Sequence, residues 1–348
     1  MSAHQGRNEA FHSVNLVDRL PENIESIETW ENNLLVGTTS GTLIKFRVAE
    51  KPAPEKRNNI SLEKSWRGWS KKPITQLCAL TRHRVLVSIC DGCIALHKLD
   101  KVEEKFHTLK NTKGCTCFAV DRTRPTLTIC VGLKRKLLIY RLENHVMVEK
   151  KELSIPDVPK SLHWCGDAIL VGLKKEYILV SAGSNATVEI AQNRSAVESS
   201  CLVPQDQVML TKDGQSVFVN FDGKVGRRYR INWTETPAAV SYNFPFALAI
   251  LGKDKGVEVR TAFSESTSFV QHIPLKGAKV IVVRDQDAHF AELDELPAAD
   301  IFVAAQHHIW KLLPVPLFDQ VDDLMRAEEF EAALTLCSNI PADKYRKQ

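Results

Sequence analysis

The sequence predicts an all-β fold, a seven-bladed β-propeller, followed by the first helices of an α-solenoid. Three observations predict it: a repeated hairpin pattern, the spacing of its copies, and a change to helical periodicity after Pro316. Each hairpin is a short apolar strand, a polar turn and a second apolar strand. The copies begin at Leu34, Val85, Leu127, Ala168, Gln207, Phe246 and Asp300. Their spacing of about 39 to 54 residues is that of four-stranded propeller blades.

The hairpin segments have the alternation of β-strands. In the first copy Ile44, Phe46 and Val48 fall on one face, whereas Lys45 and Arg47 fall on the other. A period of two residues is typical of a strand and excludes a helix. The segments therefore predict strands with one face turned toward a core.

The turns and the intervals between hairpins favour small antiparallel sheets. Turns such as Ser40-Gly41, Asp91-Gly92 and Asp222-Gly223 supply the positive φ that tight hairpins often require. A parallel α/β sheet is the alternative, but it needs crossover helices of about 10 to 15 residues. The intervals contain no amphipathic stretch of that kind.

The pattern divides the chain into a flexible N-terminal tail at 1–9, a propeller at 10–316 and the start of a solenoid at 317–348. The last hairpin lacks an outer strand, and the early segment "FHSVNLVDRLP" could supply it. That pairing would join both ends of the propeller and leave few exposed strand edges.

The segment after Pro316 predicts two short helices. Phe330, Ala333, Leu334 and Cys337 follow i, i+3, i+4 spacing and form a candidate contact face. A helical hairpin of this size cannot bury its own apolar face. We expect further solenoid helices to cover these four residues.

Composition limits the function classes. Hydrophobic residues make up 44% and charged residues 25%, and the net charge of +4 with a pI near 8.5 does not indicate nucleic-acid binding. The sequence has no apolar run of about 20 residues and no apolar signal core at its start. Nine cysteines, an odd number, predict reduced thiols in a cytoplasmic protein.

Two cysteine pairs resemble halves of a zinc site. Cys90-x-x-Cys93 lies near His97, but Cys115-x-Cys117 has the wrong gap for a zinc knuckle. The first pair flanks a predicted turn, so we expect core thiols and no metal. Motifs for a nucleophilic serine, a nucleotide phosphate or a metalloprotease are missing from the sequence. The sequence therefore predicts neither an enzyme nor a bound cofactor.

Basic turns give the sharpest candidate site. Lys134, Arg135 and Lys136 lie between the strands of one hairpin, and Lys174 and Lys175 occupy the matching place in the next. Equivalent turns of adjacent blades share one rim, where five cations would attract anionic lipid or an acidic protein surface. The alternative is that these turns are simply solvated.

Longer segments carry a resemblance to a known family. "SIPDVPKSLHWC", "CVGLKRKLLIYRL" and "HHIWKLLPVPLFDQVDDLMRAEEFEAALTL" resemble the citron-homology-domain subunits of the HOPS tethering complex. The resemblance extends from about Ala10 to Cys337 and implies a seven-bladed propeller followed by an α-solenoid. The receptor-associated propeller of the companion CORVET tether is the related alternative. The segment Arg284 to Asp300 is longer and more acidic than the corresponding region of those relatives.

The resemblance implies a non-enzymatic role in vesicle tethering, endosome to lysosome (vacuole) fusion, protein transport and autophagy. The implied partners are a Rab GTPase of the late-endosomal class and other HOPS subunits. The implied location is the cytoplasmic surface of late endosomes or lysosomes, as a peripheral protein. Two alternatives stay open: a regulator or exchange factor of a Rab or Rag-type GTPase, and a phosphoinositide-binding module.

Overall fold

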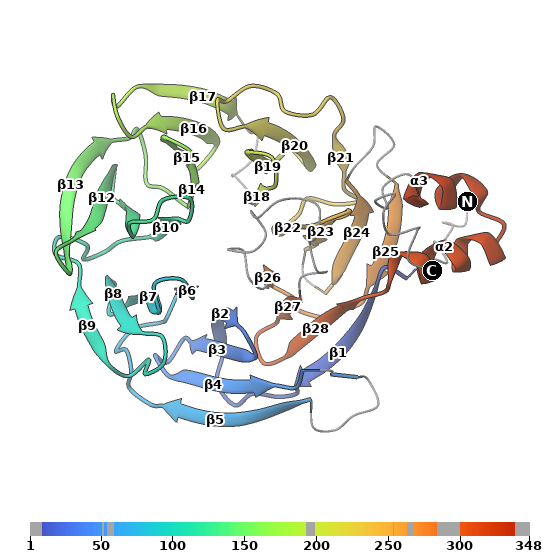
Figure 1. The fold of residues 1–348 in the computed structure, drawn as a ribbon, viewed down its shortest axis with the longest axis horizontal. Coiled ribbons are helices and arrows are strands. Elements are labelled where there is room, and N and C mark those ends of the chain that lie inside the picture. Colours follow the sequence, from blue (N-terminus) through green and yellow to red (C-terminus); the bar gives the residue numbers. More distant parts are fainter. Residues whose placement is uncertain are drawn as a thin grey trace.

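The strands of the computed structural model surround a central axis (Figure 1). The structure describes residues 9–50, 52–53, 59–192, 199–252, 254–262, 268–283 and 300–337. Within these ranges the strands form seven antiparallel four-stranded sheets, so the predicted seven-bladed propeller is confirmed. The predicted tail, apart from Glu9, and nearly all of the acidic segment before Asp300 lie outside the described residues.

Six blades use four consecutive strands each, and in each blade the strand order runs from the centre of the ring outward. Blade 1 contains β2 (Ile24–Trp30), β3 (Asn33–Thr38), β4 (Leu43–Val48) and β5 (Ile60–Trp66). Blade 2 contains β6 (Gln76–Leu80), β7 (Val85–Cys90), β8 (Cys93–Lys98) and β9 (Lys105–Thr108). Blade 3 contains β10 (Cys117–Asp121), β11 (Thr128–Leu133), β12 (Lys136–Glu143) and β13 (Val146–Ser154). Blade 4 contains β14 (Ser161–Cys165), β15 (Ala168–Gly172), β16 (Glu176–Ser181) and β17 (Thr187–Gln192). Blade 5 contains β18 (Ser200–Val203), β19 (Gln207–Lys212), β20 (Gln215–Asn220) and β21 (Ile231–Asn232). Blade 6 contains β22 (Ala239–Asn243), β23 (Phe246–Ile250), β24 (Val257–Thr261) and β25 (Phe269–Ile273).

Blade 7 joins the two ends of the propeller. It contains β26 (Val280–Val283), β27 (Ile301–Ala304), β28 (Ile309–Pro314) and, as its outer strand, β1 (Phe11–Val17). β1 pairs antiparallel with β28 in the register Phe11 to Pro314 and Asn15 to Trp310. The predicted ring closure by the N-terminal strand is therefore confirmed.

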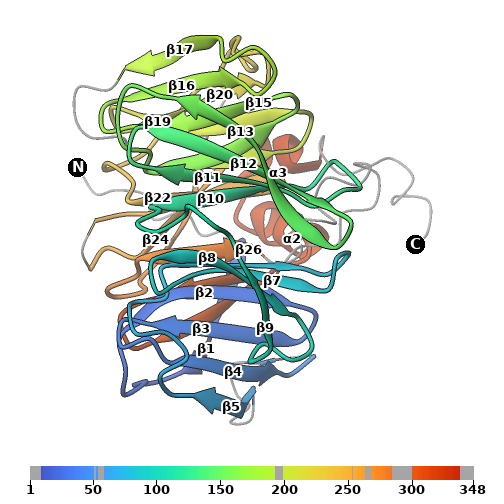
Figure 2. The same ribbon diagram turned by 90° about the vertical axis from the view of Figure 1, so that its left-hand side faces the viewer.

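The hydrophobic core lies between the blades. Each cluster of buried apolar side chains in the described residues combines residues of two neighbouring blades. Trp164 of β14 shows the principle, because it packs beside blade 3 and its Nε1 donates to the Ala119 carbonyl at 3.1 Å. Figure 2 shows the blades from the side: strands such as β2 and β3 run along the propeller axis, whereas the outer strand β13 crosses it obliquely. Sheet-on-sheet burial thus holds neighbouring blades together.

The tight turns have the backbone geometry that their residues predict. Asp91 and Gly92 in the β7–β8 turn have φ of 54° and 73°. Gly41 in the β3–β4 turn has φ of 83°, and a Cβ there would lie 1.9 Å from the Ser70 carbonyl oxygen. Glycine is required at position 41 because both the dihedral angle and the close contact exclude a side chain.

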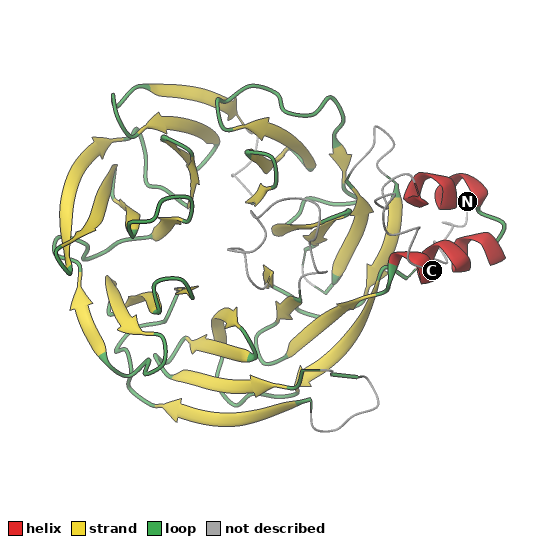
Figure 3. Cartoon of the chain, viewed as in Figure 1, coloured by secondary structure: helices red, strands yellow, loops and turns green. Residues whose placement is uncertain are grey.

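The two predicted helices lie outside the ring, beside β25 and β28 (Figures 1 and 3). They are α2 (Leu317–Arg326) and α3 (Phe330–Cys337). Leu324, Ala333 and Leu336 are buried in the cluster that blades 6 and 7 share. The helical pair therefore packs against the propeller with part of its apolar surface.

Candidate interaction surfaces

The blade topology assigns every turn to one of two faces of the propeller. Antiparallel strands alternate in direction, so the turn between the second and third strands of a blade shares its face with the connection to the next blade. The turns β7–β8, β11–β12 and β15–β16 lie on this face, which we call the connection face. The turns within blades that follow the first and third strands lie on the opposite face.

The structure places all five predicted basic residues on the connection face. Lys134 and Arg135 form the exposed β11–β12 turn of blade 3, and Lys174 and Lys175 lie at the β15–β16 turn of blade 4. Lys134 has φ of 51°, which the two-residue hairpin requires of its first turn residue. The predicted adjacency of the two turns follows from the blade order.

Lys136 differs from the other members of this rim. Its Nζ lies 2.7 Å from Glu152 Oε2 on the neighbouring strand β13. Its charge is therefore partly balanced within the blade, whereas no ion pair involves the other four cations in the described part of the chain. The effective rim consists of Lys134, Arg135, Lys174 and Lys175.

The predicted helical contact face divides into a buried and an exposed part. Ala333 is 2% exposed and packs on the propeller, while Phe330 is 58% and Leu334 73% exposed. Cys337 is half-buried. A cleft of about 540 Å³ separates α3 from blade 6, with Phe330 and Phe269 in its lining. Sequence periodicity missed this division because it does not show which side of a helix meets the propeller.

The cysteine pairs lie in and beside strands. Cys90 and Cys93 are cross-strand neighbours that flank the β7–β8 turn. Burial raises the pKa of the Cys115 thiol to about 12 and that of Cys117 to about 11, so both stay protonated. Among the described residues no group of three or more His, Cys, Asp or Glu side chains could hold a metal ion. Cys90 and Cys117 are buried in the core, whereas Cys93 and Cys115 are half-buried.

Two histidine–serine pairs in the described structure resemble part of a catalytic site. Ser88 Oγ lies 3.3 Å from His97 Nε2 in blade 2, and His163 at the central channel pairs with Ser200. The channel has a volume of about 670 Å³ and His163 lines it. His163 Nε2 lies 3.0 Å from Ser200 Oγ. Burial lowers the pKa of His163 to about 4, which makes the imidazole a weak base at neutral pH. In the described residues no carboxylate bonds to this imidazole, so the pair lacks the third group of a catalytic triad.

Sequence reasoning missed basic residues in the connections between blades. Lys113 and Lys160 lie in the β9–β10 and β13–β14 connections, exposed on the same face as the rim. In the sequence they are isolated cations in polar segments, so no local signal marks them. None of the described helices combines the length and apolar character that a membrane span requires.

Known proteins resemble this chain in sequence and in domain type. The CNH domain model matches residues 30–284. The Vam6/Vps39-like protein of Homo sapiens is 31% identical over 346 residues, which cover 94% of this chain and 37% of that protein. Vacuolar sorting protein 39 of Arabidopsis thaliana is 28% identical over 341 residues, which cover 96% of this chain and 32% of that protein.

A solved structure shows the same fold. The CNH domain of AfRom2 aligns with a TM-score of 0.63 and 15% identity over 88% of this chain and 100% of that domain. The chain spans about a third of the length of the curated relatives named above. Because the family model matches most of the propeller and the sorting proteins match nearly the whole chain, this chain belongs to the CNH domain family.

Proposed function

We propose that this chain is a non-enzymatic interaction module of a vacuolar sorting machinery of the HOPS type. The observation that carries the proposal is the similarity to Vam6/Vps39-like and vacuolar sorting proteins over about 94 to 96% of the chain. The fold supports it, since a propeller offers two faces of surface turns on a rigid scaffold. The proposed location is the cytoplasmic surface of late endosomes, lysosomes or vacuoles, as a peripheral protein.

The proposed partner is a Rab GTPase of the late-endosomal class, bound in its GTP form, together with other HOPS subunits. GTP preference is required of an effector, because only differential affinity for the two switch states couples recruitment to the GTPase cycle. The exposed rim of Lys134, Arg135, Lys174 and Lys175 supports an acidic partner. Charges near an interface act mainly on the rate of encounter.

The helices supply a second proposed contact. Phe330 and Leu334 are large apolar residues that the propeller leaves exposed. Exposed apolar patches often mark protein contacts. We propose that further helices of a full-length protein cover these two side chains, while Ala333 stays against the propeller.

The test is a binding titration of GTP-loaded and GDP-loaded Rab proteins in solution, without lipid. The chain should bind a late-endosomal Rab more tightly in the GTP form and leave the nucleotide-release rate unchanged. Equal affinity for both forms would refute the effector proposal. Accelerated nucleotide release would instead support an exchange factor.

The rim is tested in the same titration at two ionic strengths. The triple variant Lys134→Glu, Lys174→Glu and Lys175→Glu should associate more slowly than the wild type and depend less on salt. Its control carries the same charge change on the opposite face, at Arg82, Lys224 and Arg228, of which Lys224 pairs with Asp222. An association rate equal to that of the control would refute the rim as the binding surface, but it would not refute the Rab as the partner.

A further inference from the structure

The basic rim is one end of a longer positive surface on the connection face. The turns and connections from blade 1 to blade 4 carry further cations that the structure leaves exposed. Together they form what we call the basic arc: Lys71, Lys72, Lys110, Lys113, Lys134, Arg135, Lys160, Lys174 and Lys175. Its members come from the β5–β6, β9–β10 and β13–β14 connections and from two hairpin turns.

Main-chain hydrogen bonds at blades 2 and 3 make the basic arc contiguous. The Lys71 amide donates to Asp91 Oδ1 at 2.7 Å, which fixes the β5–β6 connection on the β7–β8 turn. The Gly114 amide donates to the Gly92 carbonyl at 2.7 Å, so the next connection lies on the same turn. Lys72 Nζ lies 3.4 Å from the position that a Cβ on Gly92 would occupy. Lys72 and Lys113 thus lie close to one turn.

The same arrangement continues through blades 3 and 4. The Ile155 amide donates to the Arg135 carbonyl at 3.0 Å. The Lys160 amide donates to the Gly172 carbonyl at 2.7 Å, one residue before the turn that carries Lys174. Each connection is therefore fixed to a neighbouring turn, and the cations follow one another around the face.

The charge of the basic arc is largely uncompensated. The acidic residues within its turns and connections are Asp91 and Asp157, and Asp91 already accepts hydrogen bonds from the Lys71 amide and Ser70 Oγ. In the described structure no ion pair involves a cation of the basic arc. On the same face of blade 6, by contrast, Lys255 pairs with Glu235. The positive surface thus covers one side of the connection face.

The composition of the basic arc fits lipid head groups better than a protein surface. Protein interfaces are enriched in aromatic residues and Met and depleted in lysine, with a central apolar anchor. The basic arc is lysine-rich, with eight lysines and Arg135, and the β5–β6 connection exposes one more arginine, Arg67. The large exposed hydrophobic residues of the described chain, such as Leu62, Val188 and Val225, lie outside it. A broad lysine surface without an apolar centre is typical of attraction to an anionic membrane.

We propose that the basic arc rests on the surface of an anionic lipid bilayer and holds the connection face toward the membrane. The attraction is electrostatic and uses the summed charge of flexible lysines, so it needs no insertion of apolar side chains. The ligand is a lipid surface, which goes beyond the protein partner proposed above and does not depend on it. The rim of Lys134, Arg135, Lys174 and Lys175 belongs to both proposed surfaces, so a bilayer and an acidic protein partner would compete for it, while the opposite face stays available to other proteins.

The test uses vesicle flotation with the purified chain and no GTPase. Vesicles of phosphatidylcholine are compared with vesicles in which part of that lipid is replaced by phosphatidylserine. The chain should float with the phosphatidylserine vesicles and be released by added salt, because charge screening weakens the attraction. Absence of binding to phosphatidylserine vesicles, or equal binding to both vesicle types, would overturn the proposal.

The variant avoids the rim that the Rab titration uses. Lys72→Glu, Lys113→Glu and Lys160→Glu reverse three charges of the basic arc, and the proposal predicts at least about a tenfold drop in vesicle partitioning. The opposite-face triple at Arg82, Lys224 and Arg228 should stay within about twofold of wild type. Equal losses in both triples would show a general charge effect and refute the assignment to this face.

A second variant keeps the test decisive if the reversed triple folds poorly. Glutamine at positions 72, 113 and 160 removes charge without adding like charges, and it should give an intermediate loss of partitioning. Unfolding midpoints check that each variant retains the fold. If the reversed triple lowers Rab association in solution while wild type ignores anionic vesicles, the basic arc binds protein and the lipid proposal fails.

Discussion

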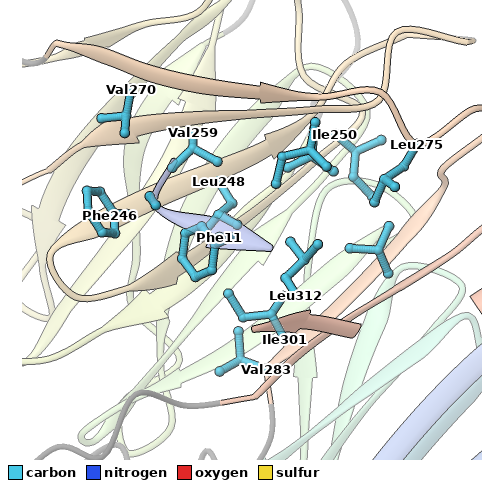
Figure 4. Close-up of a cluster of buried hydrophobic side chains, with 14 of the residues drawn as sticks. Phe11, Phe246, Leu248, Ile250, Val259, Val270, Leu275, Val283, Ile301 and Leu312 are labelled. Carbon is cyan, nitrogen blue, oxygen red and sulfur yellow. The ribbon is translucent and has the colours of Figure 1, made fainter. Parts of the chain in front are cut away.

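Replacement of Phe11 by alanine tests how strongly the closing strand holds the propeller. The Phe11 side chain is 1% exposed and meets Phe246 edge to face, with ring centroids 5.7 Å apart at 70°. Figure 4 shows the Phe11 ring between β23 residues and Leu312 of β28. The Phe11 amide and carbonyl both bond the Gln271 side chain, at 3.0 and 2.9 Å, and alanine keeps these two bonds. The substitution therefore removes packing alone.

The expected loss is large compared with the stability of an ordinary domain. A buried Phe→Ala change costs about 3 to 5 kcal/mol. The aromatic pair adds about 0.5 to 1.5 kcal/mol beyond area burial, which places Phe11→Ala in the upper part of that range. Native proteins are stable by about 5 to 15 kcal/mol, so this side chain accounts for a quarter or more of the margin.

The assay is urea unfolding followed by tryptophan fluorescence, with the free energy taken from midpoint and slope. The matched control is Phe330→Ala, which removes the same atoms from a side chain that is 58% exposed and should cost about 0.5 kcal/mol or less. A shift for Phe11→Ala no larger than the shift for Phe330→Ala would refute the packing role of the closing strand. Deletion of residues 1–20 should abolish cooperative unfolding, because blade 7 loses its outer strand.

Three further predictions concern surface, buried charge and pH. The double variant Phe330→Ser and Leu334→Ser should improve solubility without moving the unfolding midpoint, since both side chains are exposed; a lower midpoint would place them in the core. Asp300→Asn should cost about 3 to 5 kcal/mol by urea unfolding, because it leaves Lys311, 3% exposed and 2.9 Å from Asp300, without that carboxylate; a cost under about 1 kcal/mol would contradict this. Burial lowers the pKa of His97 from 6.5 to about 4, so the unfolded chain binds the proton that the folded chain rejects. The free energy of unfolding that this shift contributes is fully present above about pH 6.5 and decreases by about 3 kcal/mol as the pH falls to about 4. His97→Asn should reduce this decrease. Identical dependence of stability on pH in the wild type and the variant would exclude His97 as its source.

Local physical chemistry accounts for the elements that the sequence predicted. Alternation such as Ile44, Phe46 and Val48 determines which face of a strand is buried, because successive side chains point to opposite sides. Turn pairs such as Asp91-Gly92 determine where hairpins reverse, because only a few residue types adopt a positive φ at low conformational energy. Seven repeats with an incomplete last hairpin were then sufficient to predict closure by the first strand.

The candidate surfaces show what required the tertiary structure. Sequence determined that Lys134 and Lys174 occupy equivalent turns, because the repeat places them in register. Only the structure showed that Lys72 and Lys160, about 90 residues apart in sequence, belong to the same surface. Each connection between blades is held there by hydrogen bonds to a hairpin turn or strand end of the blade that it leaves or enters.

Helix α3 shows the same difference between what the sequence predicts and what the tertiary structure decides. The spacing of apolar residues predicted a helix with Ala333 and Leu334 on its apolar side, and the structure has this helix as α3. Packing against blades 6 and 7 buried Ala333 to 2% exposure and left Leu334 at 73%. Periodicity determined that the segment is an amphipathic helix, because side-chain direction depends on local geometry. The tertiary structure decided which apolar residues are covered, because that depends on the shape and position of surfaces formed by residues far away in the chain.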